Sequence, residues 1–288
     1  MASWIKQAVP TVPPFAMPTW IRPLVGACDD GAVLAGGWTV AQRFDVVTRA
    51  TDGQHLITRM TEDIIIKQAD DRNKAAGVLE NLYKARDDFA GLEMAKPHVM
   101  GVINTTPDSF SDGGAHLAPA NAIASGVAMS HAGASIIDIG GESTRPGAEA
   151  ITRNQELARV LPPITGLSRQ NLRISIDTRH AEVMTRACAA GAAVINDVEG
   201  LRRDGAADAA AASGAPVIIV HMQGQPENMQ VEPHYDFAPV DIYQFLEERI
   251  EVAVAAGISK SRIAIDPGFG FGKSVIHNLQ IVNWLSLF

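Results

Sequence analysis

Six short apolar runs, rich in β-branched residues, recur from His98 onward, and they constrain the fold more than any other feature. They cover His98–Ile103, Ser135–Ile139, Leu172–Ile176, Ala193–Ile195, Pro216–Val220 and Arg262–Ile265. Runs of this length without polar alternation are typical of strands covered on both faces, as in parallel sheets. Ala-rich segments with helical patterns lie between them. We therefore expect a strand–helix unit that repeats through residues 98–288.

Four of the Ala-rich segments end in a glycine that an apolar residue follows. These tripeptides are Ala132-Gly133-Ala134, Ala190-Gly191-Ala192, Ser213-Gly214-Ala215 and Ala256-Gly257-Ile258. Glycine adopts the left-handed conformation that closes a helix at little steric cost. Each tripeptide therefore predicts the end of a helix just before a new strand.

A polar residue or a glycine directly follows each apolar run: Asn104, Gly140, Asp177, Asn196, His221 and Asp266. Residues 98–288 give roughly 32 residues per unit, which matches the scale of a TIM-type (β/α)₈ barrel. In such a barrel the carboxyl ends of all strands meet at one rim, where active sites lie. In a doubly wound sheet, which is the alternative, only the strand ends near the switch point converge. The pattern favours an α/β barrel, incomplete because about six of its eight units are present.

Residues 1–95 differ in character from the rest of the chain. They contain one strand-like alternation, Trp38–Thr48, and one helical pattern, Ala75–Ala90, but no catalytic motif. We predict two domains: an N-terminal extension of unknown role at 1–95 and the barrel at 96–288.

The composition excludes several classes of protein. A formal charge of −8 and a pI near 5.5 argue against a nucleic-acid-binding surface. Cys28 and Cys188 cannot form a disulfide framework, which favours a reducing, cytoplasmic location. The N-terminus lacks the apolar core of a signal peptide, and no apolar run reaches the length of a membrane span.

Six sequence blocks carry a specific resemblance. They are Asn104–Gly114, Gly140–Gly147, Ile176–Thr178, Asn196–Val198, His221–Gly224 and Asp266–Lys273. In this order, each at the end of a predicted strand, they resemble the signatures of the dihydropteroate synthases. The resemblance implies transfer of the 7,8-dihydropterin-6-ylmethyl group from its diphosphate to p-aminobenzoate. Diphosphate is released, and the reaction belongs to folate biosynthesis.

Three polar residues are candidates for binding the pterin. A carboxylate such as Asp266 can meet the pterin's adjacent amino and ring N–H groups with two parallel hydrogen bonds. The alternative is a helix N-cap, although Pro267 and the glycines after it delay any helix. The resemblance implies that Asp177 and Asn196 complete the contacts and that Asp177 is catalytic, its charge favouring the electron-poor methylene carbon. Asp177 could instead cap a helix that starts near His180.

The resemblance assigns the remaining site residues to the metal, the diphosphate and the arylamine. Asn104 would contact Mg²⁺ that arrives with the diphosphate; alone it would be a turn residue. Thr144 and Arg145 would bind the substrates' anionic groups, and Arg145 is a candidate catalytic residue. The apolar contacts to the arylamine would come from Phe110, Pro146 and Phe271. For Phe269, a role in anchoring the loop is nearly as well supported.

Other motifs fail. Gly268–Ser274 is not a Walker loop, because Pro267 stands where a glycine is required. His221 and His234 lack a metal-binding spacing, and we expect His221 to line the rim as a strand-end residue.

Two other functions are alternatives to the synthase reaction. A pterin-binding barrel for methyl transfer is disfavoured by the Ser-Thr-Arg-Pro sequence at 143–146, and a catalytically incompetent pseudoenzyme is the other alternative. A homodimer is left open. The family has two further strands, which bear a Ser-Arg-Lys block and an Arg-His pair, whereas this chain ends at Phe288. We therefore expect the 288-residue chain to catalyse weakly or not at all.

Overall fold

The structure, a computed structural model, describes most of the chain in two compact units. The described residues are 16, 19–26, 31–37, 39–50, 53–105, 117–143, 151–225 and 228–288. One unit lies within residues 1–85 and the other begins at Arg86.

The first unit is an antiparallel sheet that packs against two helices. Its strands are β1 (Trp20–Gly26), β2 (Ala32–Val33), β3 (Val40–Arg49) and β4 (His55–Met60), and its helices are α1 (Glu62–Gln68) and α2 (Arg72–Tyr83). Strand β3 pairs with the other three strands. Its Phe44 and Val46 join Ile65 of α1 and Leu79 of α2 in one buried core.

The two elements expected in this unit are found, one of them shorter than predicted. The strand expected at Trp38–Thr48 corresponds to β3. The helix expected at Ala75–Ala90 corresponds to α2, which starts after Asp71, whose side chain accepts a hydrogen bond from the backbone N–H of Lys74. The prediction is wrong beyond Tyr83: Lys84 has φ and ψ angles of −58° and 128°, which are not helical, because the charged sequence that follows offers no apolar face to continue the helix.

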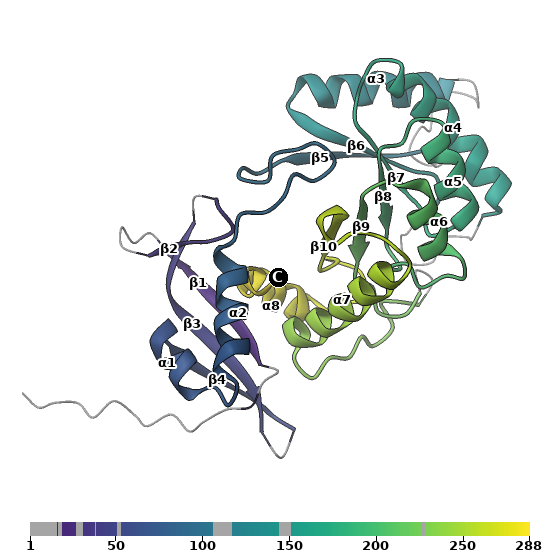
Figure 1. The fold of residues 1–288 in the computed structure, drawn as a ribbon. Helices are drawn as coiled ribbons and strands as arrows, with labels where there is room; N and C mark the ends of the chain where they lie inside the picture. Colours follow the sequence, from purple (N-terminus) through teal and green to yellow (C-terminus); the bar gives the residue numbers. More distant parts are fainter. Residues whose placement is uncertain are drawn as a thin grey trace, which may run out of the picture. The chain divides into compact units, whose positions relative to one another are not determined.

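The second unit alternates strands with helices. Its strands are β5 (Val99–Asn104), β6 (Ala134–Gly140), β7 (Ile174–Asp177), β8 (Val194–Asp197), β9 (Val217–Val220) and β10 (Ile263–Asp266). Its helices are α3 (Leu117–His131), α4 (Arg153–Ser168), α5 (Ala181–Ala189), α6 (Ala206–Ser213), α7 (Ala238–Ala255) and α8 (Val275–Asn283), with the short 3-10 helices η2 (Lys260–Arg262) and η3 (Leu285–Leu287). All strand pairs are parallel, in the order β10-β9-β8-β7-β6-β5. Figure 1 shows helices α3 to α7 along the outer side of this sheet.

All six predicted strands are present, each within two residues of its expected bounds. The four predicted helix-ending glycines also have positive φ angles: 108° at Gly133, 115° at Gly191, 69° at Gly214 and 102° at Gly257. The repeated strand–helix unit is confirmed.

The strand register separates two sets of side chains. Ile103, Ile139, Ile176 and Ile195 are paired neighbours on successive strands, and they are buried in the core that joins the sheet to its helices. The next residues along these strands form a second row, Asn104, Gly140, Asp177 and Asn196. Because side chains alternate along a strand, this second row points to the opposite, inner face.

The fold is an incomplete barrel of the (β/α)₈ type. Strands β5 and β10 stand at the two ends of the strand order, and within the described ranges neither pairs with a strand on its outer edge. No helix in the described part of the chain is both long enough and apolar enough to cross a membrane.

A buried ion pair in the first unit gives a test of its packing. Asp45 is 4% exposed and lies 2.9 Å from both Arg22 and Arg59, and Arg22 is itself buried. Asp45→Ala should lower the free energy of unfolding by about 3 kcal/mol or more, because it leaves a buried guanidinium without its carboxylate. Urea denaturation measures the loss. The exposed Glu80→Ala on α2 is the control, and similar losses for both variants would contradict the assignment.

Candidate functional site

The second row of side chains brings polar groups together at the carboxyl ends of β5 to β8. Gly140 lies between Asn104 and Asp177 in the register. A Cβ atom built on Gly140 would lie 3.3 Å from Asn104 Oδ1 and 3.3 Å from Asp177 Oδ2. These two oxygens therefore converge over Gly140, in space that a side chain there would occupy.

Asn196 joins this group through a buried carboxylate. Its Nδ2 donates a hydrogen bond of 3.2 Å to Asp138 Oδ2, and Asp138 is only 2% exposed. The Oδ1 atoms of both residues are buried and have no hydrogen-bond partner among the residues that the structure describes. Buried polar atoms rarely stay unsatisfied, so these two are suited to meet a ligand.

Sequence reasoning missed Asp138. One signal was available: Asp138 is the only acid in the apolar run Ser135–Ile139, two residues before Gly140 and therefore on the same face of the strand.

Two carboxyl groups of this site have raised pKa values. Burial raises the pKa of Asp138. Burial, followed by the charges of Asp138 and Asp197, raises the pKa of Asp177 well above its usual range. Like charges in a desolvated site disfavour ionisation, and a positive or electron-poor group beside them is stabilised.

Asp266 approaches the same inner face from β10. It pairs with Val220 in the register, and Ile218 of β9 pairs with Asn196. Ile218 and Val220 therefore lie between Asn196 and Asp266, where they belong to an apolar cluster that includes Phe271. The site thus combines polar groups at its ends with an apolar patch between them, an arrangement suited to a flat ring.

The structure argues against both capping alternatives. Asp266 Oδ1 accepts a 2.7 Å hydrogen bond from the N–H of Gly268, but no helix starts there, because α8 begins after Ser274, which caps it. Helix α5 begins after His180, whose backbone N–H is bound by Thr178 Oγ1 and not by Asp177. Asp177 and Asp266 therefore remain available to a ligand.

His221 was expected to line the rim as a strand-end residue, but it is buried. It follows Val220, so its side chain points to the helix layer, where its ring packs edge-to-face on Phe245 of α7 at 4.8 Å between centroids. Its Nδ1 lies 2.8 Å from Nζ of Lys273, a residue that sequence reasoning did not assign a role. Only the folded chain reveals this contact, because the two residues are far apart in sequence.

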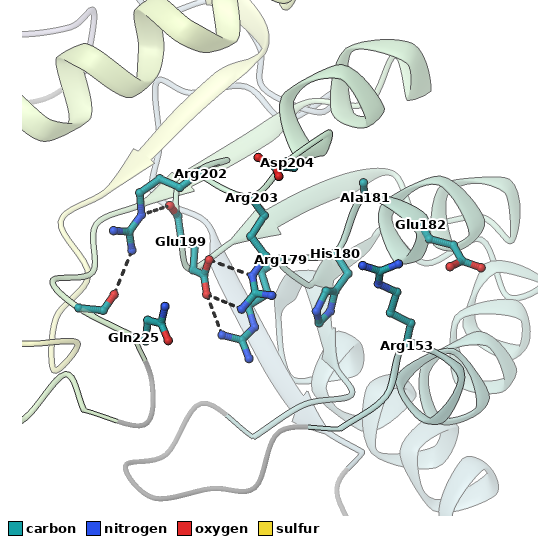
Figure 2. Close-up of a pocket in the computed structure, with 11 residues that line it drawn as sticks. Arg153, Arg179, His180, Ala181, Glu182, Glu199, Arg202, Arg203, Asp204 and Gln225 are labelled. Atoms are coloured by element: carbon teal, nitrogen blue, oxygen red, sulfur yellow. Dashed lines mark hydrogen bonds and ion pairs between the residues drawn. The ribbon is translucent and has the colours of Figure 1, made fainter.

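A pocket of about 890 Å³ lies at the same rim, over the loops that follow β7, β8 and β9. Figure 2 shows Arg179 and Arg203 both directed at Glu199. Arg179 also holds Glu142 with two hydrogen bonds of 2.9 Å, and Arg202 donates to the carbonyl of Glu199. Because carboxylates neutralise much of the arginine charge, the main role of the network is to connect the ends of β6, β7 and β8.

The predicted site residues fall into two groups. Asn104, Asp177, Asn196 and Asp266 occupy the inner rim, with Phe271 in the adjoining apolar cluster. Phe269 is 60% exposed and anchors no core. The others lie outside the described residues: Phe110, Thr144, Arg145 and Pro146.

Comparison with known proteins identifies the family of this chain. The profile of the family described as "Pterin binding enzyme" matches residues 100–288. The chain belongs to this family. Its match runs from the second residue of β5 through β10 and includes all the site residues named above.

Curated relatives are dihydropteroate synthases. That of Escherichia coli K12 is 44% identical over 198 residues, which are 68% of this chain and 70% of the relative. That of Haemophilus influenzae is 42% identical, over 68% of this chain and 72% of the relative.

Solved structures agree with these relatives. A Yersinia pestis dihydropteroate synthase in a sulfonamide complex has a TM-score of 0.64 at 47% identity, covering 69% of this chain and 73% of its own. A Xanthomonas albilineans dihydropteroate synthase with 4-aminobenzoic acid has a TM-score of 0.64 at 50% identity, covering 69% and 72%. The incomplete barrel and the transferase class of the family follow from these matches.

The buried His221 predicts a pH dependence of stability. Burial and the charge of Lys273 lower the pKa of His221 from 6.5 to about 3. Between these values the unfolded chain binds a proton that the folded chain does not, so stability falls as the pH decreases. One such group contributes at most about 1.4 kcal/mol per pH unit.

His221→Asn should remove this component, because its amide oxygen can still accept from Lys273 but does not titrate. Urea denaturation of both proteins from neutral pH down to about pH 5 measures the two slopes. The wild type should lose stability more steeply, and parallel slopes would show that His221 does not titrate as argued.

Proposed function

We propose that this chain acts as a dihydropteroate synthase, with its pterin site at the inner rim of β5 to β10. The observation that carries the proposal is the gathering of Asn104, Asp177, Asn196 and Asp266 around an apolar patch. Relatives support it: one structure is described as holding 7,8-dihydropteroate and another as holding 4-aminobenzoic acid.

The pterin ring would lie across the patch formed by Ile218 and Val220. At one end, Asp266 would accept hydrogen bonds from the ring's amino group and ring N–H. Both of its carboxylate oxygens would take part, although Oδ1 already accepts from the N–H of Gly268. At the other end, Asn196 and Asp138 offer buried oxygens without partners in the described chain. An amide and a carboxyl together suit a heterocycle that presents both donors and acceptors.

The metal proposal concerns Mg²⁺ at Asn104. The described residues contain no group of three His, Cys, Asp or Glu side chains that could hold a metal by themselves. The amide oxygen of Asn104 and a carboxylate oxygen of Asp177 nevertheless converge over Gly140, and oxygen donors of this kind are those that Mg²⁺ accepts. The residues fit an ion that also uses diphosphate oxygens, and bound Mg²⁺ would supply charge neutralisation of the leaving group.

The reaction that this site would support is a group transfer. The C–O bond between the pterin methylene and the diphosphate breaks, the arylamine nitrogen forms the new bond to that carbon, and the nitrogen releases one proton to water. An arylamine is nucleophilic when neutral, so the protein must mainly orient the reactants. The negative charge of Asp177 would stabilise the carbon as it becomes electron-poor.

Removing Asp266 tests pterin recognition. Asp266→Ala should weaken binding of the dihydropterin diphosphate by about 3 kcal/mol, roughly two orders of magnitude, because a charged bidentate partner is lost. Isothermal titration calorimetry in the presence of Mg²⁺ measures the dissociation constant. Asp208→Ala, at an exposed position on α6, is the matched control. Equal affinities for Asp266→Ala and the wild type would refute the assigned contact.

A thermodynamic cycle tests the role of Asn104. The wild type should bind the dihydropterin diphosphate more tightly with Mg²⁺ than in EDTA. Asn104→Ala should lose most of this Mg²⁺-dependent gain while keeping the affinity measured in EDTA, because it removes a metal ligand and no pterin contact. A variant that weakens binding equally under both conditions would instead make Asn104 a direct substrate contact.

A further inference from the structure

Lys273 is a charged residue enclosed inside the second unit. It belongs to the loop that joins β10 to α8, and the residue is 3% exposed. Its Nζ lies 2.7 Å from the carbonyl oxygen of Gly268, 2.8 Å from that of Phe271 and 2.8 Å from His221 Nδ1. A fourth acceptor, the carbonyl oxygen of His221, lies at 3.2 Å.

These contacts suit the charged form of Lys273. An ammonium group has three protons and can donate to all three close acceptors at once. In that form His221 Nδ1 accepts, and the ring proton lies on Nε2. Burial lowers the pKa of Lys273 to about 7, and the charge of Asp266 acts in the opposite direction. The surrounding carbonyls thus hold a charge that would otherwise be costly to bury.

The loop around Lys273 has little freedom. A Cβ atom on Gly268 would lie 1.8 Å from the carbonyl oxygen of His221, and the φ angle of Gly268 is +68°. The Tyr235 hydroxyl donates to the carbonyl of Gly272 at 2.7 Å. The backbone N–H of His221 donates to the carbonyl of Asp266 at 2.9 Å. The segment that leads from β9 to α7 is therefore joined to β10 and to the loop after it by two further hydrogen bonds.

We propose that Lys273 is a positioning residue for the synthase reaction, which sets the positions of Asp266 and Phe271 by binding Gly268, Phe271 and His221 at once. The inference rests on the proposed function, because it concerns the groups that would meet the pterin and the arylamine. Its three protons are occupied by protein acceptors, so Lys273 acts through the loop and not by contact with substrate. The apolar cluster that contains Phe271 depends on the same anchor.

The test compares Lys273→Met, which keeps a long unbranched side chain, with Lys260→Met, which removes an exposed lysine at the other end of β10. Calorimetry measures the dissociation constant for the dihydropterin diphosphate, and circular dichroism confirms that each protein is folded at the temperature used. We expect Lys273→Met to bind about tenfold or more weakly and Lys260→Met to bind as the wild type does. In a steady-state assay of the synthase reaction, Lys273→Met should raise the KM for p-aminobenzoate by a larger factor than it lowers kcat.

A second variant keeps the inference testable if Lys273→Met does not fold. His221→Leu removes one of the three short contacts and leaves the ammonium in place, so it should weaken binding in the same sense but less. His221→Asn, which restores an acceptor, should recover most of the affinity.

The outcomes separate the inference from the proposed function. A wild type that binds no dihydropterin diphosphate overturns both. A wild type that binds, with a folded Lys273→Met of equal affinity, overturns the inference alone. If Lys273 had a purely structural role, Lys273→Met would have a smaller folded fraction, and that fraction would bind with an unchanged dissociation constant. This result would also count against the inference.

Discussion

The alternation of side chains along parallel strands in register is the constraint on which the rest of the second unit depends. One register row, which contains Ile103, Ile139 and Ile176, is buried against the helices. The next row, which contains Asn104 and Asp177, must then face inward. Burial of the first row therefore determines where the polar groups lie, and a shift of one residue would exchange the two sets. The same packing that stabilises the sheet assembles the candidate site.

Much of this arrangement is predictable because it is periodic. Apolar β-branched runs identify the six strands. Glycines mark the ends of four helices to within two residues. In the first unit the signal is weaker: β1 contains Arg22 and Pro23, so its sequence lacks the continuous apolar run of a buried strand. Arg22 is buried because Asp45 answers its charge. A partner 23 residues away is not visible in a local pattern.

The candidate site shows the same division between local and tertiary information. Asp177, Asn196 and Asp266 are predictable because each ends a strand, and strand ends meet at one rim. Asp138 and Lys273 were missed because charged residues are normally exposed, and each is buried by contacts that only the folded chain brings together. Burial of these charges has a consequence for function. It raises the pKa of the inner carboxyls, so they ionise more readily when a positive or electron-poor group lies beside them.

The glycines of the Gly268–Lys273 segment illustrate how a motif can suggest the wrong chemistry. Repeated glycines before a lysine suggest a phosphate-binding loop, in which backbone amides surround an anion and lysine contacts it. Here the glycines answer a steric demand: a Cβ on Gly272 would lie 2.6 Å from the carbonyl oxygen of Gln223, and one on Gly268 would overlap His221. The lysine turns inward to carbonyl oxygens, which are acceptors and would repel an anion. The segment is therefore suited to hold Asp266 and Phe271 against β9, and any phosphate of the substrate must be met elsewhere on the rim.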